Sequence, residues 1–210
     1  MAQLQYPIFY IDSRDGYNIY HFYLRNKDMK PYIFVDLDET LIHTYDYHET
    51  PCKCAVPVTV EDNEYKTSLR PGAKEFLAKL REIGEVRMLT IATYEYAKVM
   101  NALFKFNFAL DDIYAREHIQ SPSINLEPAE FVYLFDNLPL RENRRKVEFL
   151  RCVTINKVPS YIQVKEYRGG QRFPLDQEEI DRLTKTLYGS NSITTENTEG
   201  ALHTSRRETD

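Results

Sequence analysis

The stretch YIFVDLDETLIHT, residues 32–44, decides the fold class. Its first four residues are apolar without alternation, which is typical of a short strand buried on both faces of a parallel sheet. Two acidic residues, Asp36 and Asp38, follow this run, and Thr40 comes soon after. Because ligands bind at the carboxyl ends of the strands in such sheets, we expect these side chains at a functional site.

Patterns of strands and helices alternate along the rest of the chain. Apolar runs predict core strands at 86–90, 131–135 and 161–167, and apolar residues at helical spacing predict helices at 73–84, 96–104 and 176–187. The predicted fold class is therefore α/β, with a Rossmann-like, mostly parallel central sheet that is covered on both faces.

Two segments are expected to lie outside this domain, which we place at 32–188, and a third forms an insertion within it. Residues 1–31 contain two tyrosine-rich, β-prone runs around Asp15-Gly16 and predict an N-terminal β-hairpin. Within the core, residues 45–69 predict a small insertion whose strands at 56–60 and 65–69 form a β-hairpin. Residues 189–210 contain too few aliphatic side chains to repay the entropy of ordering, so we expect a disordered tail.

The overall composition narrows the class of protein. A chain of 210 residues with 42% hydrophobic residues can bury a core, which excludes a fibrous or wholly disordered protein. A formal net charge of −5 gives no reason to expect binding to nucleic acid or to an anionic membrane. No run approaches the roughly 18 apolar residues of a membrane-spanning helix.

The cysteines are few and odd in number. Because only Cys52, Cys54 and Cys152 occur and no apolar leader follows the first residue, we expect an intracellular protein, nuclear or cytoplasmic, with unpaired thiols. The cysteine pair could hold zinc together with a nearby histidine, His43 or His48, but a fourth ligand at suitable spacing is not evident. We expect His43 to be a structural, hydrogen-bonded histidine.

Polar side chains gather where three of the predicted strands end. Asp36, Asp38 and Thr40 follow the first strand, Thr90 ends the second, and Asp136 and Asn137 follow the third. This oxygen-rich set suits Mg²⁺ and a phosphate group, which predicts phosphoryl transfer with one carboxylate as nucleophile and another as proton carrier. A calcium-binding loop starting at Asp36 is excluded, because Leu41 and Tyr47 stand where it needs Gly and Glu.

Several motifs in the right order resemble a known family. They are VDLDETLIHT at 35–44, LRPG at 69–72, Leu89-Thr90 with Tyr96-Ala97, IYAREH at 113–118 and LFDN at 134–137. Together they resemble the haloacid dehalogenase superfamily and, more narrowly, the RNA polymerase II C-terminal-domain phosphatases and NLI-interacting-factor-like phosphatases. The similarity spans about residues 32–138 and continues more weakly to 187.

The resemblance implies a role for each matching residue. Asp36 would be the nucleophile that forms an aspartyl-phosphate, and Asp38 the general acid/base that also offers its backbone carbonyl to Mg²⁺. The remaining assignments are Asp136 and Asn137 for the metal, Thr90, Ile91 and Arg116 for the phosphate, and Tyr45, Val58, Val60 and Tyr96 for a substrate pocket. The implied cofactor is Mg²⁺, and the implied partner is a phosphorylated protein or peptide.

One departure from the family concerns a lysine. The family supplies a lysine before the strand at 131–135, yet the sequence has none between Phe106 and Arg145. Phosphoryl transfer needs a positive partner beyond one metal ion, so either another cation substitutes or turnover is weak. The candidates are Arg116, Arg141, Arg144, Arg145 and Lys146, although the run at 141–146 is also typical of a solvated helix face.

Three functions therefore stay open. The first is a Mg²⁺-dependent phosphatase of phosphoserine or phosphothreonine peptides, such as the RNA polymerase II C-terminal domain. The second is a phosphatase of nucleotides or polynucleotides, because the same core serves both substrate classes. The third is a catalytically weak phosphopeptide-binding module, which the missing lysine would favour.

Overall fold

The computed structural model describes residues 30–121, 126–155, 158–170 and 173–189. The chain divides into two compact units, Met1–Lys30 and Pro31–Asp210, and the elements below all belong to the second. The hairpin predicted at 1–31 and the tail predicted at 189–210 lie almost wholly outside the described residues and stay predictions. Among the described residues, no helix has the length and hydropathy that a membrane-spanning segment needs.

The described elements alternate largely as predicted. The strands are β1 (Tyr32–Val35), β2 (Ile42–Thr44), β3 (Val56–Val60), β4 (Asn63–Leu69), β5 (Glu85–Leu89), β6 (Ile113–Tyr114), β7 (Val132–Asp136) and β8 (Ser160–Gln163). The helices are α2 (Ala73–Ile83), α3 (Tyr94–Phe104), the short 3₁₀ helix η2 (Leu110–Asp112), α4 (Arg116–Gln120), α5 (Arg144–Arg151) and α6 (Gln177–Gly189).

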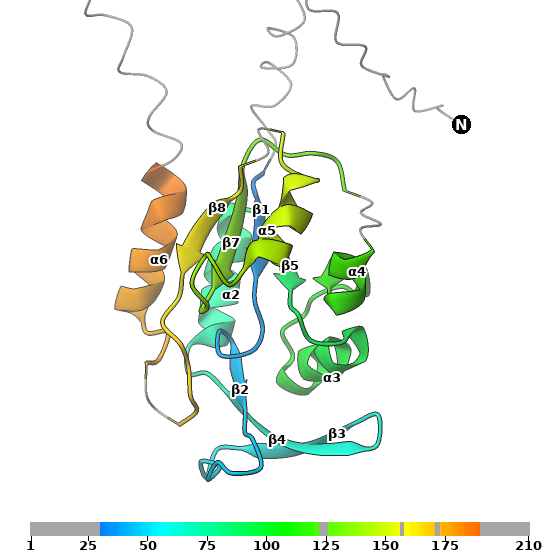
Figure 1. The fold of residues 1–210 in the computed structure, drawn as a ribbon. Coiled ribbons are helices and arrows are strands. Elements are labelled where there is room, and N and C mark those ends of the chain that lie inside the picture. The colour runs from blue at the N-terminus through cyan, green and yellow to red at the C-terminus, as the bar shows by residue number, and fades with distance from the viewer. Residues whose placement is uncertain (1–29, 122–125, 156–157, 171–172, 190–210) are drawn as a thin grey trace, which may run out of the picture. The chain divides into compact units, whose positions relative to one another are not determined.

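The central sheet is five-stranded, entirely parallel, and ordered β6-β5-β1-β7-β8 (Figure 1). β1 lies in the middle, where Val35 pairs with Met88 of β5 and with Phe135 of β7. All four residues of β1 are buried, as the unbroken apolar run predicts. The predicted α/β class is therefore confirmed, and the carboxyl ends of β1, β5 and β7 lie side by side.

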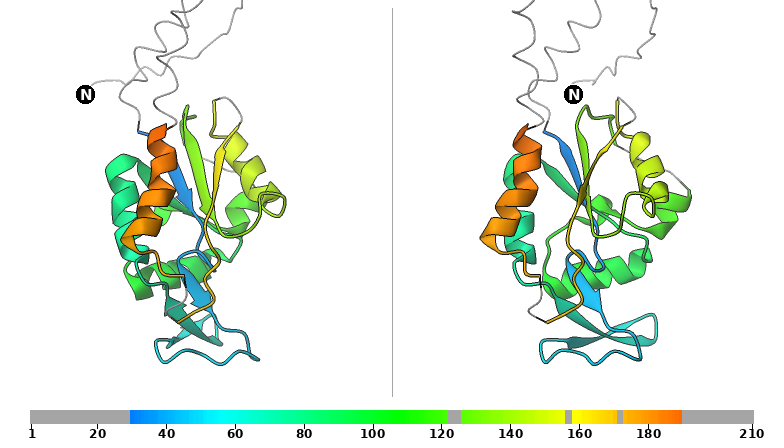
Figure 2. Two further views of the ribbon diagram at one scale, coloured as in Figure 1. Left: turned by 90° about the vertical axis from the view of Figure 1, so that its left-hand side faces the viewer. Right: turned by 60° about the vertical axis from the view of Figure 1, so that its left-hand side comes forward.

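Helices cover both faces of this sheet (Figure 2). On one face, Ile33 and Val35 belong to a core cluster shared with α2, α3 and α6. On the other face, Phe34 clusters with Phe149 and Leu150 of α5. Alternate residues of β1 thus serve two separate cores, and truncating Phe34 to alanine should destabilise the fold by about 3–5 kcal/mol.

The insertion after β1 is a separate three-stranded antiparallel sheet ordered β2-β4-β3 (Figure 1). The predicted hairpin is confirmed as β3 and β4, in which Val58 pairs with Tyr65. The third strand, β2, was not predicted because it is only three residues long and directly follows the acidic motif. It joins the insertion to the loop that carries Asp36 and Asp38.

Two local features differ from simple sequence expectations. The strand predicted at 161–167 ends at Gln163, because the chain then turns toward the acidic loop, where the Tyr167 N–H donates to the Glu39 carbonyl at 2.7 Å. α2 begins after Gly72, whose φ is 82°. A Cβ atom there would lie 1.7 Å from the Leu175 carbonyl oxygen, so both the turn and the close approach require glycine.

Candidate active site

The loop after β1 is tightly curled and presents its two acids at the edge of the sheet. The Asp36 N–H donates to the Phe135 carbonyl at 2.9 Å, which extends the pairing of β1 with β7 by one step. The N–H groups of Leu41 and Ile42 both donate to the Leu37 carbonyl, and Glu39 has a φ of 55°. This turn buries Asp36 and leaves Asp38 half-buried.

Thr40 links this loop to the end of β7. Its hydroxyl donates to Asp36 Oδ2 at 3.2 Å, and it accepts from the Asn137 N–H at 3.2 Å. The threonine side chain is fully buried. The carboxyl ends of β1 and β7 are therefore linked by a side-chain hydroxyl as well as by strand pairing. The sequence predicts that these two strand ends lie close together.

The positive partner of the acids is Lys146 on α5. Its ammonium lies 2.5 Å from Asp36 Oδ1 and 2.7 Å from Asp136 Oδ2, and the side chain is only 1% exposed. The interpretation of this basic run as a solvated helix face is wrong for Lys146. A lysine is present in the site, but it comes from the helix after the last strand motif, not from the segment before it.

The other candidate cations lie elsewhere. Arg141, Arg144 and Arg145 are all exposed, and Arg141 lies 3.5 Å from its neighbour Glu142. Lys146 was recognisable from its spacing, because Phe149 and Leu150 follow at three and four positions and place it on the apolar face of the helix. The sequence signal for the buried lysine was therefore the amphipathic spacing of this helix. The family motifs did not point to it, because the family places its lysine before the strand at 131–135.

Burial and charge compete in this cluster. Burial is the largest influence on Asp36 and raises the pKa of its carboxyl to about 7, although the Lys146 ammonium opposes this rise. Burial by itself would lower the pKa of Lys146, but Asp36 and Asp136 outweigh it and the net shift is upward. Lys146 is therefore charged at neutral pH, and its position against two carboxylates is an ion triad.

Three oxygens beside this triad fit a hard divalent cation. The Asn137 side-chain amide lies 3.2 Å from the Asp38 carbonyl oxygen and 3.3 Å from Asp36 Oδ2, and both of these atoms are acceptors. With its nitrogen inward the amide donates to them; with its oxygen inward it completes a carboxylate, carbonyl and amide set, which is typical of Mg²⁺. The described residues contain no cluster of three His, Cys, Asp or Glu side chains suited to a metal.

Asp136 is already satisfied by neighbouring donors. One carboxylate oxygen accepts from the Leu138 N–H at 2.9 Å, and the other contacts Lys146. The predicted metal ligands thus divide in the structure: Asp36, the Asp38 carbonyl and Asn137 converge, while Asp136 holds the lysine. The backbone of Asn137 is in turn fixed by Gln163, whose side-chain amide donates to the Asn137 backbone carbonyl at 3.2 Å.

The second acid of the motif is held by a tyrosine. The Tyr96 hydroxyl donates to Asp38 Oδ1 at 2.7 Å, and Thr44 Oγ1 lies 2.6 Å from the same hydroxyl. Burial raises the pKa of the Asp38 carboxyl, and the bond from Tyr96 partly offsets that rise. Tyr96, predicted as a pocket residue, therefore also fixes the predicted general acid/base from α3.

The predicted phosphate-binding residues meet at the end of β5. Thr90 is fully buried, and its hydroxyl accepts from the Ala92 N–H at 3.1 Å, while Ile91 is 53% exposed. Arg116 is exposed, and its guanidinium donates to the Ile91 carbonyl at 2.9 Å. The structure thus places these residues in one loop cluster at the same edge of the sheet as Asp36.

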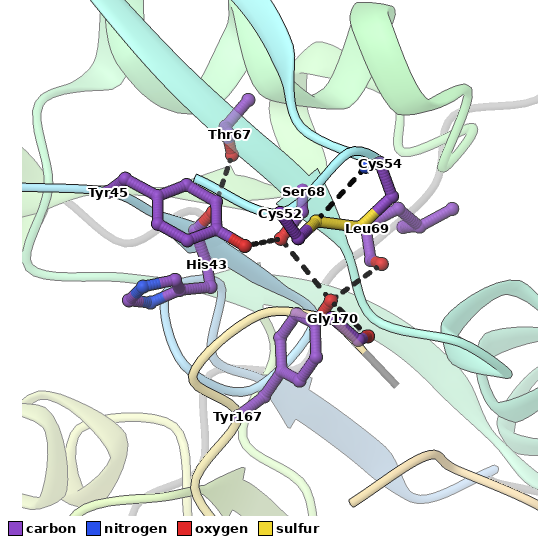
Figure 3. The surroundings of a disulfide bond; sticks show 9 residues. All are labelled: His43, Tyr45, Cys52, Cys54, Thr67, Ser68, Leu69, Tyr167 and Gly170. Carbon is purple, nitrogen blue, oxygen red and sulfur yellow. Dashed lines mark hydrogen bonds between the residues drawn. A yellow bond between two sulfur atoms is a disulfide. The ribbon is translucent and has the colours of Figure 1, made fainter. Parts of the chain in front are cut away.

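The predicted substrate pocket is only partly assembled. Val58, Val60 and Tyr96 belong to one cluster, and the ring of Tyr65 lies 5.9 Å from that of Tyr96. Tyr45 follows β2 and does not belong to this cluster. Its hydroxyl lies 3.3 Å from Ser68 Oγ, which in turn lies 3.3 Å from the hydroxyl of Tyr167 (Figure 3).

The cysteine pair on the insertion is oxidised. Cys52 and Cys54 form a disulfide (Figure 3), so the prediction of unpaired thiols is wrong for them, and the zinc alternative loses its thiolate ligands. Cys152 is free, as predicted, and it is exposed. His43 is buried between two glutamates, with Nδ1 3.2 Å from Glu39 and Nε2 3.2 Å from Glu49, which agrees with a structural histidine.

Comparison with known proteins adds the following findings. Among curated proteins, no sequence matches the chain significantly. The structure of fission yeast RNA polymerase II CTD phosphatase Fcp1-R271A bound to beryllium fluoride is 16% identical, with a TM-score of 0.47, and the match covers 82% of this chain and 54% of that one. A second structure, of Fcp1, an essential RNA polymerase II CTD phosphatase, is also 16% identical, with a TM-score of 0.48 and coverage of 88% and 58%. The chain therefore spans only about half to three fifths of the length of these proteins.

The sequence model of one family matches a continuous segment of the chain. This family is described as NLI interacting factor-like phosphatase, and the match covers residues 31–129. The segment holds Asp36, Asp38, Thr90 and Arg116, whereas Asp136 and Lys146 follow it. Residues 31–129, just under half of the chain, are therefore similar to the NLI interacting factor-like phosphatase family.

Proposed function

We propose that this domain is a Mg²⁺-dependent phosphatase that removes phosphate from phosphoserine or phosphothreonine in proteins through an aspartyl-phosphate. The observation that carries this proposal is the ion triad of Lys146 with Asp36 and Asp136. Without such a cation, the phosphate group and the carboxylates would repel one another. Its presence removes the reason for preferring a catalytically weak binding module.

The first chemical step uses the two acids of the loop after β1. An Asp36 carboxylate oxygen attacks phosphorus, and the bond from phosphorus to the serine or threonine oxygen breaks. Asp38 gives its proton to the leaving oxygen, a role that fits a carboxyl whose pKa burial has raised. The products of this step are the free hydroxyl side chain and a phosphorylated Asp36.

The second step reverses the roles of proton donor and acceptor. Asp38, now ionised, takes a proton from a water molecule as the water oxygen attacks phosphorus. The bond between phosphorus and the Asp36 oxygen breaks, which releases inorganic phosphate and restores the carboxylate. Tyr96 keeps Asp38 in one position through both steps by its 2.7 Å hydrogen bond.

Two positive groups, a bound Mg²⁺ and Lys146, would offset the negative charge of the phosphate. The residues that would hold Mg²⁺ are Asp36, the Asp38 carbonyl and Asn137, and the bound ion would neutralise phosphate charge. Lys146 faces the other oxygen of Asp36, so it orients the nucleophile and offsets the phosphate charge. Thr90 and the N–H of Ile91 would bind the remaining phosphate oxygens.

The apolar face of the insertion supports a peptide substrate. Val58, Val60 and Tyr65 lie beside Tyr96, whose hydroxyl contacts Asp38. A side chain next to the phosphorylated residue would bury apolar surface there. Peptides from the RNA polymerase II C-terminal domain are the first protein substrates to test.

The decisive experiment measures phosphate release with and without a chelator. The wild type and Asp36→Asn are assayed on a small aryl phosphate, a phosphoserine peptide and a nucleoside monophosphate in Mg²⁺. Turnover that the chelator and Asp36→Asn both abolish, with the peptide preferred, supports the proposal. Preference for the nucleotide would favour the alternative substrate class, and binding of the phosphopeptide without turnover by the wild type would favour a binding module.

A further inference from the structure

A shallow groove with a surplus of positive charge runs along the outer face of α5. Its volume is about 570 Å³, and it is lined by Leu140, Arg141, Arg144, Val147, Glu148 and Arg151. Three arginines face a single glutamate in this set, whereas the whole chain has a net charge of −5. The side chains that line the groove therefore carry a net positive charge on a chain whose net charge is negative.

Two of these arginines have no internal role. Within the part of the chain that the structure describes, neither Arg144 nor Arg151 has a hydrogen-bond or salt-bridge partner, and both are exposed. Leu140 is 53% exposed, which adds an apolar contact to the charged groups. Free guanidinium groups beside an exposed apolar side chain fit an acidic peptide that also carries an apolar residue.

The groove adjoins the candidate active site through the chain itself. Leu140 and Arg141 belong to the loop that leaves Asp136, and Lys146 lies on the same helix as the arginines. An eight-residue helix is about 12 Å long. An extended chain at about 3.3 Å per residue spans this length with about four residues, so flanking positions from about the fourth onward are the ones to test.

We propose that the groove on α5 binds an acidic segment of the protein substrate that flanks the phosphorylated residue. This inference rests on the proposed phosphatase function and adds a substrate class to it: phosphoproteins with several Asp, Glu or further phosphorylated residues near the target site. Arg144 and Arg151 would pair with those acids, and Leu140 with Val147 would contact an apolar side chain between them.

The test compares two phosphoserine peptides that differ only in their flanks. One carries three Asp residues four to six positions from the phosphoserine, and the other carries three Asn residues there. We expect the wild type to show a kcat/KM about tenfold higher for the Asp peptide at low salt, with the preference reduced at 0.5 M salt. In Arg144→Glu with Arg151→Glu, this preference should vanish while turnover of a small aryl phosphate stays within twofold.

Arg145→Glu is the matched control, because Arg145 is an exposed arginine on the same helix that does not line the groove. It should retain most of the preference for the Asp peptide. Equal loss of preference in this variant and in the double variant would overturn the proposal, since general charge would then explain it. A wild type without preference would overturn it as well.

Binding experiments distinguish an error in the groove proposal from an error in the proposed phosphatase function. Fluorescence anisotropy with the two labelled peptides and the Asp36→Asn protein measures binding without turnover. Preferential binding of the Asp peptide that depends on Arg144 and Arg151, with no turnover by the wild type, keeps the groove and rejects the phosphatase. Turnover by the wild type with equal binding of both peptides keeps the phosphatase and rejects the groove.

Discussion

The Lys146 ammonium lies 2.5 Å from Oδ1 of Asp36, although 110 positions separate the two residues in the chain. β1 positions the carboxylate at the centre of the sheet, and α5 brings the lysine to it from the element after β7. An ammonium that reaches this position beside Asp36 supplies the same charge from any segment, so the site does not depend on where in the sequence its lysine occurs.

Replacing the lysine should abolish most catalysis. We expect Lys146→Met to lower kcat for an aryl phosphate by about 10²–10³-fold, because the positive charge opposite Asp36 is lost. The two remaining carboxylates would be buried without a cation, at a cost of about 3–5 kcal/mol of stability. Steady-state kinetics and urea unfolding measure the two effects.

The matched control for this variant is Arg145→Met, which removes the exposed neighbouring charge. It should leave kcat and the unfolding free energy nearly unchanged. If Lys146→Met folds and turns over at the wild-type rate, Lys146 has no part in the reaction.

The effect of Mg²⁺ on stability should increase with pH. Burial raises the pKa of Asp36 from 3.8 to about 7, so the folded protein holds this proton more tightly than the unfolded chain. The stability that the proton contributes is fully present below about pH 4 and is lost as the pH rises through about 7. Mg²⁺ requires the ionised carboxylate, so its stabilisation should be small at pH 5.5 and large at pH 8.

Thermal unfolding in Mg²⁺ and in chelator at both pH values measures this difference. At a Mg²⁺ concentration ten times its dissociation constant, the expected stabilisation at pH 8 is about 1.4 kcal/mol. Asp36→Asn should show little Mg²⁺ effect at either pH. An equal Mg²⁺ effect at pH 5.5 and pH 8 in the wild type would contradict the placement of the ion against Asp36.

Local sequence patterns predicted most of the core, because its strands are continuous apolar runs and its helices have clear spacing. The meeting of the acids at the strand ends was also predictable, because parallel strands bring their carboxyl ends to one edge of the sheet. Asp36, Thr40 and Asn137 meet there by direct hydrogen bonds, as that rule requires.

The parts that local patterns could not predict depend on contacts between distant segments. Lys146 was one of several candidate cations in a run that is also typical of a solvated helix face. Its spacing to Phe149 and Leu150 indicates burial, but its contacts with Asp36 and Asp136 follow only from the tertiary fold. Tyr45 was predicted to line one pocket with Val58, yet its hydroxyl lies 3.3 Å from Ser68 Oγ, outside the cluster of Val58 and Tyr96. In both cases the partners of the side chain come from distant segments, which one sequence does not reveal.

Reducing the disulfide should have a small effect. Cys52 and Cys54 enclose a single residue, and for so short a loop the chain-entropy relation gives about 1.6 kcal/mol. We expect a reductant, or Cys52→Ser with Cys54→Ser, to lower Tm by a few degrees and to leave aryl phosphate turnover unchanged. Loss of turnover in both conditions would show that the insertion loop supports the catalytic acids.

Removing one hydroxyl should affect proton transfer selectively. Tyr96→Phe deletes the donor that lies 2.7 Å from Asp38 Oδ1 and keeps the aromatic ring against the insertion. Because Asp38 would then be held less firmly as general acid, we expect kcat/KM to fall about tenfold for substrates with poor leaving groups, such as phosphoserine. Aryl phosphates with strongly acidic leaving groups need little proton donation and should lose less than threefold.

Tyr65→Phe, which alters the neighbouring ring without a bond to Asp38, is the matched control and should behave as the wild type across a series of aryl phosphates. A loss in Tyr96→Phe that is the same for every leaving group would contradict a role through Asp38 and indicate a general loss of pocket structure.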